Sequence, residues 1–267
     1  MKKTNYKSSA PSLDFYYNLN TLTSECTYAT HCHNAYEILF LLSGTATVLT
    51  EGRTYPIKKY DLVITRPMSF HSIDIYGSQK YSRINILVNS SKRLVRLLDA
   101  LSQKLEVVNC ENIPTIIDCF KKTETYYKHF ATEDFNVLLN NLLVEVCYNL
   151  QMRDSVIEQE FSTSSKTITD ALEYINENLF DIKDVTDVCR HLYVSETHLF
   201  RLFKQEIRTS PKKYITTKRL LYAQRLLSEG EKPTAIFNRC GFNNYISFYQ
   251  RYLDFFGYAP SDEPIKP

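Results

Sequence analysis

Four side chains in the first third of the chain have the types and the spacing of a ligand or metal site. His31, His33 and Glu37 follow one another as H-x-H-x3-E, and His71 lies further along the chain. Alternate side chains of a β-strand point to the same face, so His31 and His33 share a face and Glu37 keeps the same parity. Three imidazole nitrogens and one carboxylate form a set that a divalent transition metal accepts.

The same four residues have two further interpretations. Imidazoles and carboxylates inside a protein hydrogen-bond to one another without any ligand. They also serve as the polar groups that line a pocket for a small polar molecule. We predict a small-molecule site without a bound metal at His31, His33, Glu37 and His71. A metal-dependent enzyme that uses these four residues is the alternative.

Short strand signals surround these residues. Apolar or alternating runs, separated by turn signals such as Ser-Gly and Arg-Pro, cover residues 37–42, 45–50, 61–65 and 83–88. Strands of this length and spacing are typical of an antiparallel sandwich or barrel. With Gly44 after Glu37 and Pro67 before His71, the series is similar to the two cupin motifs. This resemblance implies a cupin-like barrel at about residues 10–90.

The apolar period becomes helical after residue 91. Two runs have this spacing: Leu94, Leu97, Leu98, Leu101, Leu105 and Val108, then Phe135, Leu138, Leu139, Leu142, Val146 and Leu150. Neither glycine nor proline occurs between Pro114 and Pro211, which favours helix in that stretch. The run from Phe135 to Leu150 is either core packing against the sheet or a self-association surface, and two helices exceed what one barrel needs to cover itself. We therefore predict a helical dimerisation segment at residues 91–152 and a polar linker at 153–166.

The composition excludes several classes of protein. Only 6 of the 267 residues are glycine, and neither G-x-G-x-x-G nor G-x-x-x-x-G-K-S/T occurs, which excludes the Gly-rich nucleotide-binding loops. The 7 cysteines form no C-x-x-C pair, which argues against a thiolate zinc site or a disulfide framework. The first residues, MKKTNYKSSA, lack the apolar run of a signal peptide or membrane helix. These features predict a cytoplasmic protein with no membrane partner.

Positive charge is concentrated in one part of the last hundred residues. The net charge is only +2, but residues 195–225 contain eight Lys or Arg against two acidic residues. The apolar pattern predicts a helix after an N-cap at Thr169, a short helix at 182–193, and a further helix from an N-cap at Ser195 to about residue 206. A short helix, a tight turn and a capped basic helix are typical of a helix-turn-helix.

A longer series of motifs resembles one family. The motifs are Ser195-Glu-Thr-His-Leu-Phe-Arg-Leu-Phe-Lys, Ser210-Pro-Lys-Lys-Tyr-Ile, Arg219 through Ala223 to Leu226-Leu227, Cys240-Gly-Phe, Ser247-Phe248 and Phe256-Gly-Tyr-Ala-Pro260. In this order they resemble the DNA-binding domain of AraC/XylS-type transcriptional regulators over residues 166–261. The resemblance implies an all-α domain at 167–262 with two helix-turn-helix units joined by a long helix at 211–228. Their recognition helices would enter successive major grooves on one face of DNA.

The resemblance assigns DNA contacts to individual residues of the first unit. Its base-reading positions fall on Thr197, Phe200 and Arg201. Arg201 is the strongest candidate because arginine pairs bidentately with guanine. Lys204 and Lys212 are expected to contact phosphates.

The second unit departs from the family pattern. Its recognition helix, at about 244–255, has Gln250 where the family usually has arginine and Leu253 where it usually has lysine, whereas Arg251 takes a position that is commonly apolar. Fewer phosphate contacts lower the affinity for DNA. The candidate DNA contacts of this unit are Asn244, Tyr245, Tyr249 and Gln250.

Together these observations predict an α+β two-domain protein: an N-terminal antiparallel β-barrel, cupin-like, with helices, then a C-terminal all-α double helix-turn-helix. We expect a transcription regulator, with activation as the expected mode, that binds double-stranded DNA as a homodimer. His31, His33, Glu37 and His71 would bind its small, sugar-like effector, and RNA polymerase is a further candidate partner. We expect no catalytic residue and no cofactor. The alternative is a cupin-type metal-dependent enzyme.

Overall fold

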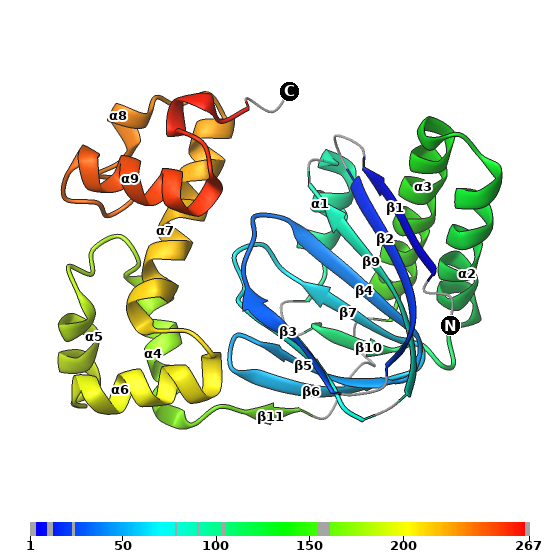
Figure 1. Ribbon diagram of the computed structural model, residues 1–267, viewed down its shortest axis with the longest axis horizontal. Helices are drawn as coiled ribbons and strands as arrows, with labels where there is room; N and C mark the ends of the chain where they lie inside the picture. Colours follow the sequence, from blue (N-terminus) through cyan, green and yellow to red (C-terminus); the bar gives the residue numbers. More distant parts are fainter. Residues whose placement is uncertain are drawn as a thin grey trace. The chain divides into compact units, whose positions relative to one another are not determined.

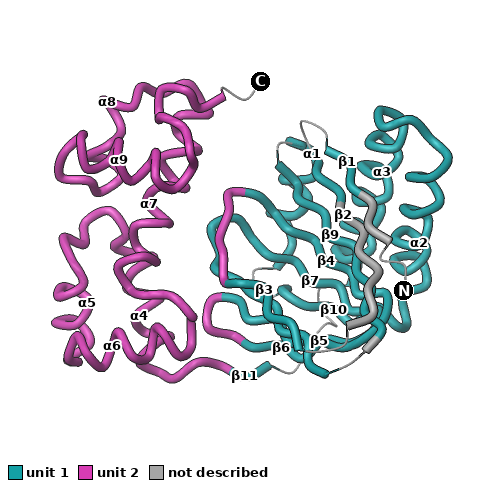
Figure 2. The backbone as a smooth tube through the Cα atoms, viewed as in Figure 1, with its two compact units in different colours: residues 1–29, 35–50, 54–162 teal, residues 30–34, 51–53, 163–267 magenta. Residues whose placement is uncertain are grey.

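A computed structural model of the protein describes residues 4–9, 13–22, 25–77, 79–89, 91–102, 105–153 and 161–264. The chain forms two compact units (Figure 1 and Figure 2). The first unit spans residues 1–29, 35–50 and 54–162, and the second spans 30–34, 51–53 and 163–267. Residues 154–160 of the predicted linker lie outside the described residues.

Antiparallel strands dominate the N-terminal part of the chain. They are β1 (Thr4–Ser9), β2 (Leu13–Leu22), β3 (Cys26–His31), β4 (Tyr36–Ser43), β5 (Thr45–Thr50), β6 (Arg53–Lys58), β7 (Asp61–Thr65), β8 (His71–Ile75), β9 (Gln79–Val88), β10 (Val107–Asn109) and β11 (Ser162–Thr163). One sheet has six strands in the order β1-β2-β9-β4-β7-β10, and the other has five in the order β11-β6-β5-β8-β3.

The predicted closed barrel is wrong. A barrel requires hydrogen bonds between every pair of neighbouring strands around its circumference. Within the described residues, the edge strands β1 and β10 of one sheet pair with neither β3 nor β11 of the other. The antiparallel character is confirmed, but the strands form two separate sheets.

Strand β4 explains why residues 37–42 read as an unbroken apolar run. Side chains alternate between the two faces of a strand. Ile38 and Phe40 join a core that includes the helices after β9, whereas Leu39 and Leu41 join a second core with residues of β5, β6 and β8. Because both faces of β4 are buried, its sequence does not alternate between apolar and polar residues.

Three helices cover one face of the six-stranded sheet (Figure 1). They are α1 (Lys92–Asp99), α2 (Pro114–His129) and α3 (Thr132–Gln151). Phe120 of α2 stacks on Phe40 of β4 with ring centroids 4.2 Å apart, and Phe135 of α3 meets Phe15 of β2 edge to face at 5.0 Å. These aromatic contacts anchor α2 and α3 to the sheet.

The helical run predicted from Leu94 to Val108 is correct only in its first half. Helix α1 ends at Asp99, and Val108 belongs to β10, where it pairs with Leu62 of β7. Valines at 107 and 108 favour a strand, and β7 supplies backbone partners for it. The second predicted run lies entirely within α3.

The second unit consists mainly of helices. They are α4 (Lys166–Glu177), α5 (Val185–Leu192), α6 (Glu196–Leu202), the π-helix η1 (Phe203–Ile207), α7 (Pro211–Ser228), α8 (Pro233–Ile236), α9 (Tyr245–Phe256) and the 3-10 helix η2 (Pro260–Asp262). In Figure 1, α7 lies between the group α4, α5 and α6 and the group α8 and α9. The long helix predicted at 211–228 is confirmed. Among the described residues, no helix combines the length and the apolar character that crossing a membrane requires.

Local sequence signals start α7 and set its packing. Ser210 accepts a hydrogen bond from the Lys213 amide at 3.2 Å, and proline occupies the first helical position. Tyr214, near the start, meets Phe203 of η1 edge to face. Leu227, near the end, belongs to the core that α7 shares with α8 and α9. The helix therefore packs against both groups.

The predicted N-cap at Thr169 is wrong. Helix α4 begins at Lys166, and Thr169 lies inside it. The Thr169 hydroxyl donates to the Ser165 carbonyl at 3.4 Å, a bond that allows threonine to stay within a helix.

Candidate functional site

The face of α6 that carries the predicted base-reading residues is exposed. Ser195 caps the helix, as predicted, by accepting a hydrogen bond from the His198 amide at 3.3 Å. Leu199 and Leu202 are buried on the inner side. The predicted contacts on the outer side are Thr197, Phe200 and Arg201 of α6, followed by Lys204 in η1. Their spacing of three and four residues places them on one face of the helix.

Arg201 is held on this face by two neighbours. Its Nη1 donates to Gln205 Oε1 at 3.3 Å, and its Nη2 lies 3.4 Å from His198 Nδ1. Neither partner is a carboxylate, so the guanidinium does not lose its charge to an ion pair in these contacts. Arg201 thus has both the position and the donors for a bidentate contact with a base.

Helix α9 carries the predicted contacts of the second unit, and it uses several of them in its own packing. Asn244 caps the helix, because its Oδ1 accepts from the Ser247 amide at 2.8 Å. Tyr245 and Tyr249 are half-buried, with ring centroids 6.2 Å apart. Gln250 is exposed and donates to Asp254 Oδ1 at 2.7 Å. Gln250 is therefore more accessible than either tyrosine.

One buried arginine connects the two groups of helices. Arg219 of α7 is only 8% exposed, and burial lowers the pKa of its guanidinium below the ordinary value. Its Nε donates to the Leu179 carbonyl at 2.8 Å, its Nη2 to the Ile182 carbonyl at 2.5 Å and its Nη1 to the Gly241 carbonyl at 2.8 Å. The first two carbonyls belong to the α4–α5 connection and the third to the α8–α9 connection. Three charge-assisted hydrogen bonds thus fix one connection against the other.

Gly241 leaves the space that this arginine occupies. Its φ of +76° lies in the left-handed region that favours glycine. A Cβ atom at this position would lie 2.7 Å from Arg219 Cζ and 2.9 Å from the Phe180 carbonyl oxygen. Any side chain here must displace the guanidinium or the backbone.

Arg251 and Tyr193 of this unit are exposed but were not among the predicted DNA contacts. Arg251 of α9 is exposed and donates from Nε to Ser247 Oγ at 3.2 Å. The sequence did contain a signal for it, since arginine replaces a commonly apolar residue there. Tyr193, between α5 and α6, is 96% exposed with a φ of 55°. No sequence pattern marks Tyr193, because its exposure depends on how the turn folds.

In the N-terminal part of the chain, Glu37 of β4 and His71 of β8 form a buried pair. Their exposed fractions are 8% and 6%, and His71 Nε2 lies 3.2 Å from Glu37 Oε2. On its other side, His71 Nδ1 lies 2.9 Å from the Ser69 carbonyl oxygen. Because a carbonyl oxygen only accepts, Nδ1 carries the proton in this contact.

His31 and His33 complete the predicted cluster. His31 ends β3, which neighbours β8 in the five-stranded sheet, and the His31 and His33 ring centroids are 5.7 Å apart. One ligand atom from each of the four residues lies within 4.8 Å of the others. The four predicted residues are therefore close together, but the predicted shared strand is wrong. His33 lies in the connection after β3, and Glu37 belongs to β4 of the other sheet.

The cluster has the donors of a metal centre. Three imidazole nitrogens and one carboxylate could approach a divalent transition metal at about 2.0–2.2 Å. The Ser69 carbonyl behind His71 is a usual outer partner of a metal-bound histidine. A metal would have to replace the hydrogen bond between Glu37 and His71. The same donors, with that bond intact, can hydrogen-bond to hydroxyl groups of a small polar molecule.

Two family models match the chain, and each contains one of the two sites. The model "AraC-like ligand binding domain" matches residues 23–121, which include the His31, His33, Glu37 and His71 cluster. The model "Helix-turn-helix domain" matches residues 188–263, which include α6 and α9.

Three curated relatives are similar to this chain over different parts of its length. The HTH-type transcriptional activator RhaS of Shigella dysenteriae is 23% identical over 94% of this chain and 95% of its own length. The lactose operon transcription activator of Staphylococcus xylosus is 23% identical over 70% of this chain and 65% of its own length. The raffinose operon transcriptional regulatory protein RafR of Pediococcus pentosaceus is 30% identical over 47% and 46%. The chain thus spans less than two thirds of the latter two relatives.

The fold and the two matched domains define a two-domain regulator with a ligand-binding domain before a helix-turn-helix domain. The chain belongs to the AraC family of transcription regulators.

The contact between Gly241 and Arg219 predicts a difference between two glycine substitutions. Gly241→Ala and Gly257→Ala both place alanine at a positive φ, but a Cβ at 257 meets nothing within 4 Å. We expect Gly241→Ala to destabilise the protein by about 1 to 3 kcal/mol more than Gly257→Ala, because only the former displaces a buried charge. Urea unfolding followed by circular dichroism measures both. Equal losses would contradict the assigned role of Arg219.

Proposed function

We propose that this chain is a sequence-specific DNA-binding regulator of transcription. The observation that carries the proposal is the capped, exposed face of α6 with Thr197, Phe200 and Arg201. Arginine reads guanine through two hydrogen bonds, and the other two side chains can contact thymine methyl groups. In this proposal α5 crosses the DNA backbone while α6 enters the major groove.

The helices α8 and α9 form the second helix-turn-helix of the proposal. Asn244 and Gln250 are exposed and carry amide groups, which pair with adenine. Tyr245 and Tyr249 expose part of their rings and contribute at the edge of the contact. The exposed Asp254 repels phosphates, so this unit binds more weakly than the first.

Lys204 and Lys212 supply phosphate contacts in this scheme. Both are exposed, and both follow α6 along the chain, Lys204 in η1 and Lys212 in the first turn of α7. Contacts to phosphates strengthen binding to every sequence and make it dependent on salt.

The cluster of His31, His33, Glu37 and His71 binds a small polar effector in this proposal. Its donors and acceptors match the hydroxyl groups of a sugar. Regulators of a lactose operon and of a raffinose operon are among the relatives, which supports a sugar-like effector. A cupin-type metal-dependent enzyme is the second candidate, favoured by the 4.8 Å spacing of the four ligand atoms.

Dimerisation is assigned to the helical segment at residues 91–152. Val137 and Tyr148 of α3 are 62% and 46% exposed and lie eleven residues, or about three helical turns, apart on one side of the helix. Two exposed apolar side chains on one side of a helix can contact a second copy of the chain. The effector changes DNA binding in this proposal if it binds one arrangement of the dimer better than another. RNA polymerase is the protein partner expected at the promoter. Sedimentation equilibrium of the purified protein would contradict this assignment if it showed only monomer.

Arg201→Ala tests the assigned DNA contact. The duplex for the test is one that the wild-type protein selects from a random-sequence library. We expect a loss of about 1 to 3 kcal/mol on that duplex and relaxed preference at one base pair, because a bidentate contact is removed. Fluorescence anisotropy at fixed salt measures it. Arg225→Ala is the control, since Arg225 of α7 is outside the proposed DNA contacts and lies 4.0 Å from Glu229. Wild-type affinity in Arg201→Ala would refute the assignment.

His33→Ala tests the effector site. We expect a panel of mono- and disaccharides to contain one that raises the thermal midpoint of the wild type but not of the variant. At a sugar concentration 100 times Kd, the free energy of unfolding of the wild type should rise by about 2.7 kcal/mol. His129→Ala, in α2, is the control, because His129 is exposed and bonds to the Thr125 carbonyl.

Metal analysis of the same proteins separates the two candidate functions. We expect less than one equivalent of transition metal in the wild type, because Glu37 and His71 already bind each other. One full equivalent of transition metal in the wild type, absent from His33→Ala, would instead favour the metal-dependent enzyme.

A further inference from the structure

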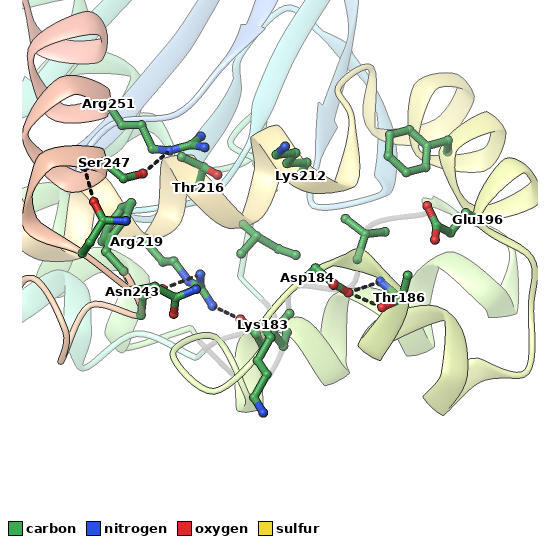
Figure 3. Close-up of a pocket in the computed structure, with 17 residues that line it drawn as sticks. Lys183, Asp184, Thr186, Glu196, Lys212, Thr216, Arg219, Asn243, Ser247 and Arg251 are labelled. Atoms are coloured by element: carbon green, nitrogen blue, oxygen red, sulfur yellow. Dashed lines mark hydrogen bonds between the residues drawn. The ribbon is translucent and has the colours of Figure 1, made fainter.

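A cleft of about 530 Å³ lies between the two recognition helices. Its lining includes Phe200 from α6, Lys212 from the first turn of α7, and Asn244, Ser247 and Arg251 from α9. Figure 3 shows Arg251, Thr216 and Lys212 along one wall of the cleft. Residues from both predicted DNA surfaces therefore border one hollow.

Two pairs of side chains define this wall. Lys212 and Thr216 are four residues apart on α7, and Ser247 and Arg251 are four residues apart on α9, so each pair shares a helix face. A second hollow of about 490 Å³ also has Lys212, Thr216 and Arg251 in its lining. The wall is therefore accessible from both hollows.

Positive charge on this wall is not neutralised by neighbouring acids. Lys212 and Arg251 are exposed, and among the described residues neither has a carboxylate within ion-pair distance. Asp254, three residues after Arg251 on α9, lines the second hollow and accepts a hydrogen bond from Gln250. The acidic groups of the cleft, Asp184 and Glu196, lie away from this wall in Figure 3.

Arg251 is partly oriented by its own helix. Its Nε donates to Ser247 Oγ at 3.2 Å, and both residues line the cleft. This bond uses one of the five N–H groups of a guanidinium, so the terminal nitrogens can still bind an anion. A planar guanidinium held in this way suits a phosphate group.

DNA geometry places a backbone at this cleft. Two recognition helices in successive major grooves of one face must straddle the minor groove and its two phosphodiester strands. We propose that the Lys212 and Arg251 wall binds phosphates of a strand that crosses between the two major grooves, which makes Arg251 a backbone contact of the second unit. This inference rests on the proposed DNA-binding function.

The sequence of α9 is consistent with this role. The family usually has arginine at the position of Gln250 and lysine at that of Leu253, and this chain has a cation at neither. It has Arg251 instead, at a commonly apolar position. Arg251 is the one cation of α9, and its side chain lines the cleft.

Arg251→Ala in the full-length chain tests the proposal. The probes are the duplex that the wild type selects from a random library and an unrelated duplex of equal length. We assume that the variant loses one phosphate contact and that both proteins bind DNA equally at 1 M salt. The DNA affinity of the variant is then lower than that of the wild type by about 15-fold at 50 mM salt and about fourfold at 200 mM. The plot of log affinity against log salt should become shallower by about one on both duplexes.

Three comparisons make the test specific. Arg225→Ala is the matched control, since Arg225 is exposed on α7, lies 4.0 Å from Glu229 and is outside the lining of both hollows. Arg251→Lys should recover most of the salt slope. Neutral methylphosphonate linkages placed between the two major-groove sites of α6 and α9 should remove the difference in DNA affinity between the wild type and Arg251→Ala. Thermal melting verifies that each variant is folded.

The possible results separate this proposal from the function on which it rests. If Arg251→Ala has the DNA affinity and the salt slope of the wild type, the backbone contact is overturned. The proposed DNA-binding function still holds in that case if Arg201→Ala loses affinity in a sequence-dependent way. A loss confined to the selected duplex also overturns the backbone contact, because Arg251 would then read a base. If the wild type selects no duplex at all, the proposed function fails and this contact with it.

Discussion

The guanidinium of Arg219 fixes the two groups of helices in the second unit relative to each other. It is buried, and its three hydrogen bonds reach the α4–α5 connection on one side and the α8–α9 connection on the other. A buried charge that loses its partners is strongly unfavourable, so the connections cannot separate without a large cost in free energy. Helices α6 and α9 are therefore held at one separation, and the cleft between them has a defined width. Gly241 is part of the same constraint, because a side chain there would occupy the place of the arginine.

Strand β4 has the corresponding role near the candidate effector site. Its side chains enter two cores in alternation, so the strand is anchored from both faces. Glu37, near its start, is consequently held in a buried position where it meets His71. A carboxylate in such a place gains from any ligand that supplies a donor, and it loses if the pair is broken without replacement. This combination favours a site that responds to a bound molecule.

The sequence predicted best those features that depend on short-range signals. The N-cap at Ser195 and the helix from Pro211 to Ser228 are encoded by residues within one or two turns. The separation of the two sheets was not predictable, because pairs such as Val108 with Leu62 join residues far apart in the chain. The predicted cluster of His31, His33, Glu37 and His71 is brought together by the fold, but not by the strand parity from which it was predicted. The three residues of H-x-H-x3-E do not share a strand, so their proximity depends on how the chain turns between β3 and β4. The hydrogen bonds of Arg219 to three carbonyls leave no side-chain pattern at all.

We propose that α6 and α9, held at a fixed separation, contact two successive major grooves on one face of DNA. Hydroxyl-radical footprinting of the wild-type protein on its selected duplex tests this directly, because it reports protected sugars without requiring base-specific contacts. We expect, for each DNA-binding domain, two protected stretches about 10 base pairs apart on the same face of the duplex. A single protected stretch the width of one major groove would contradict it.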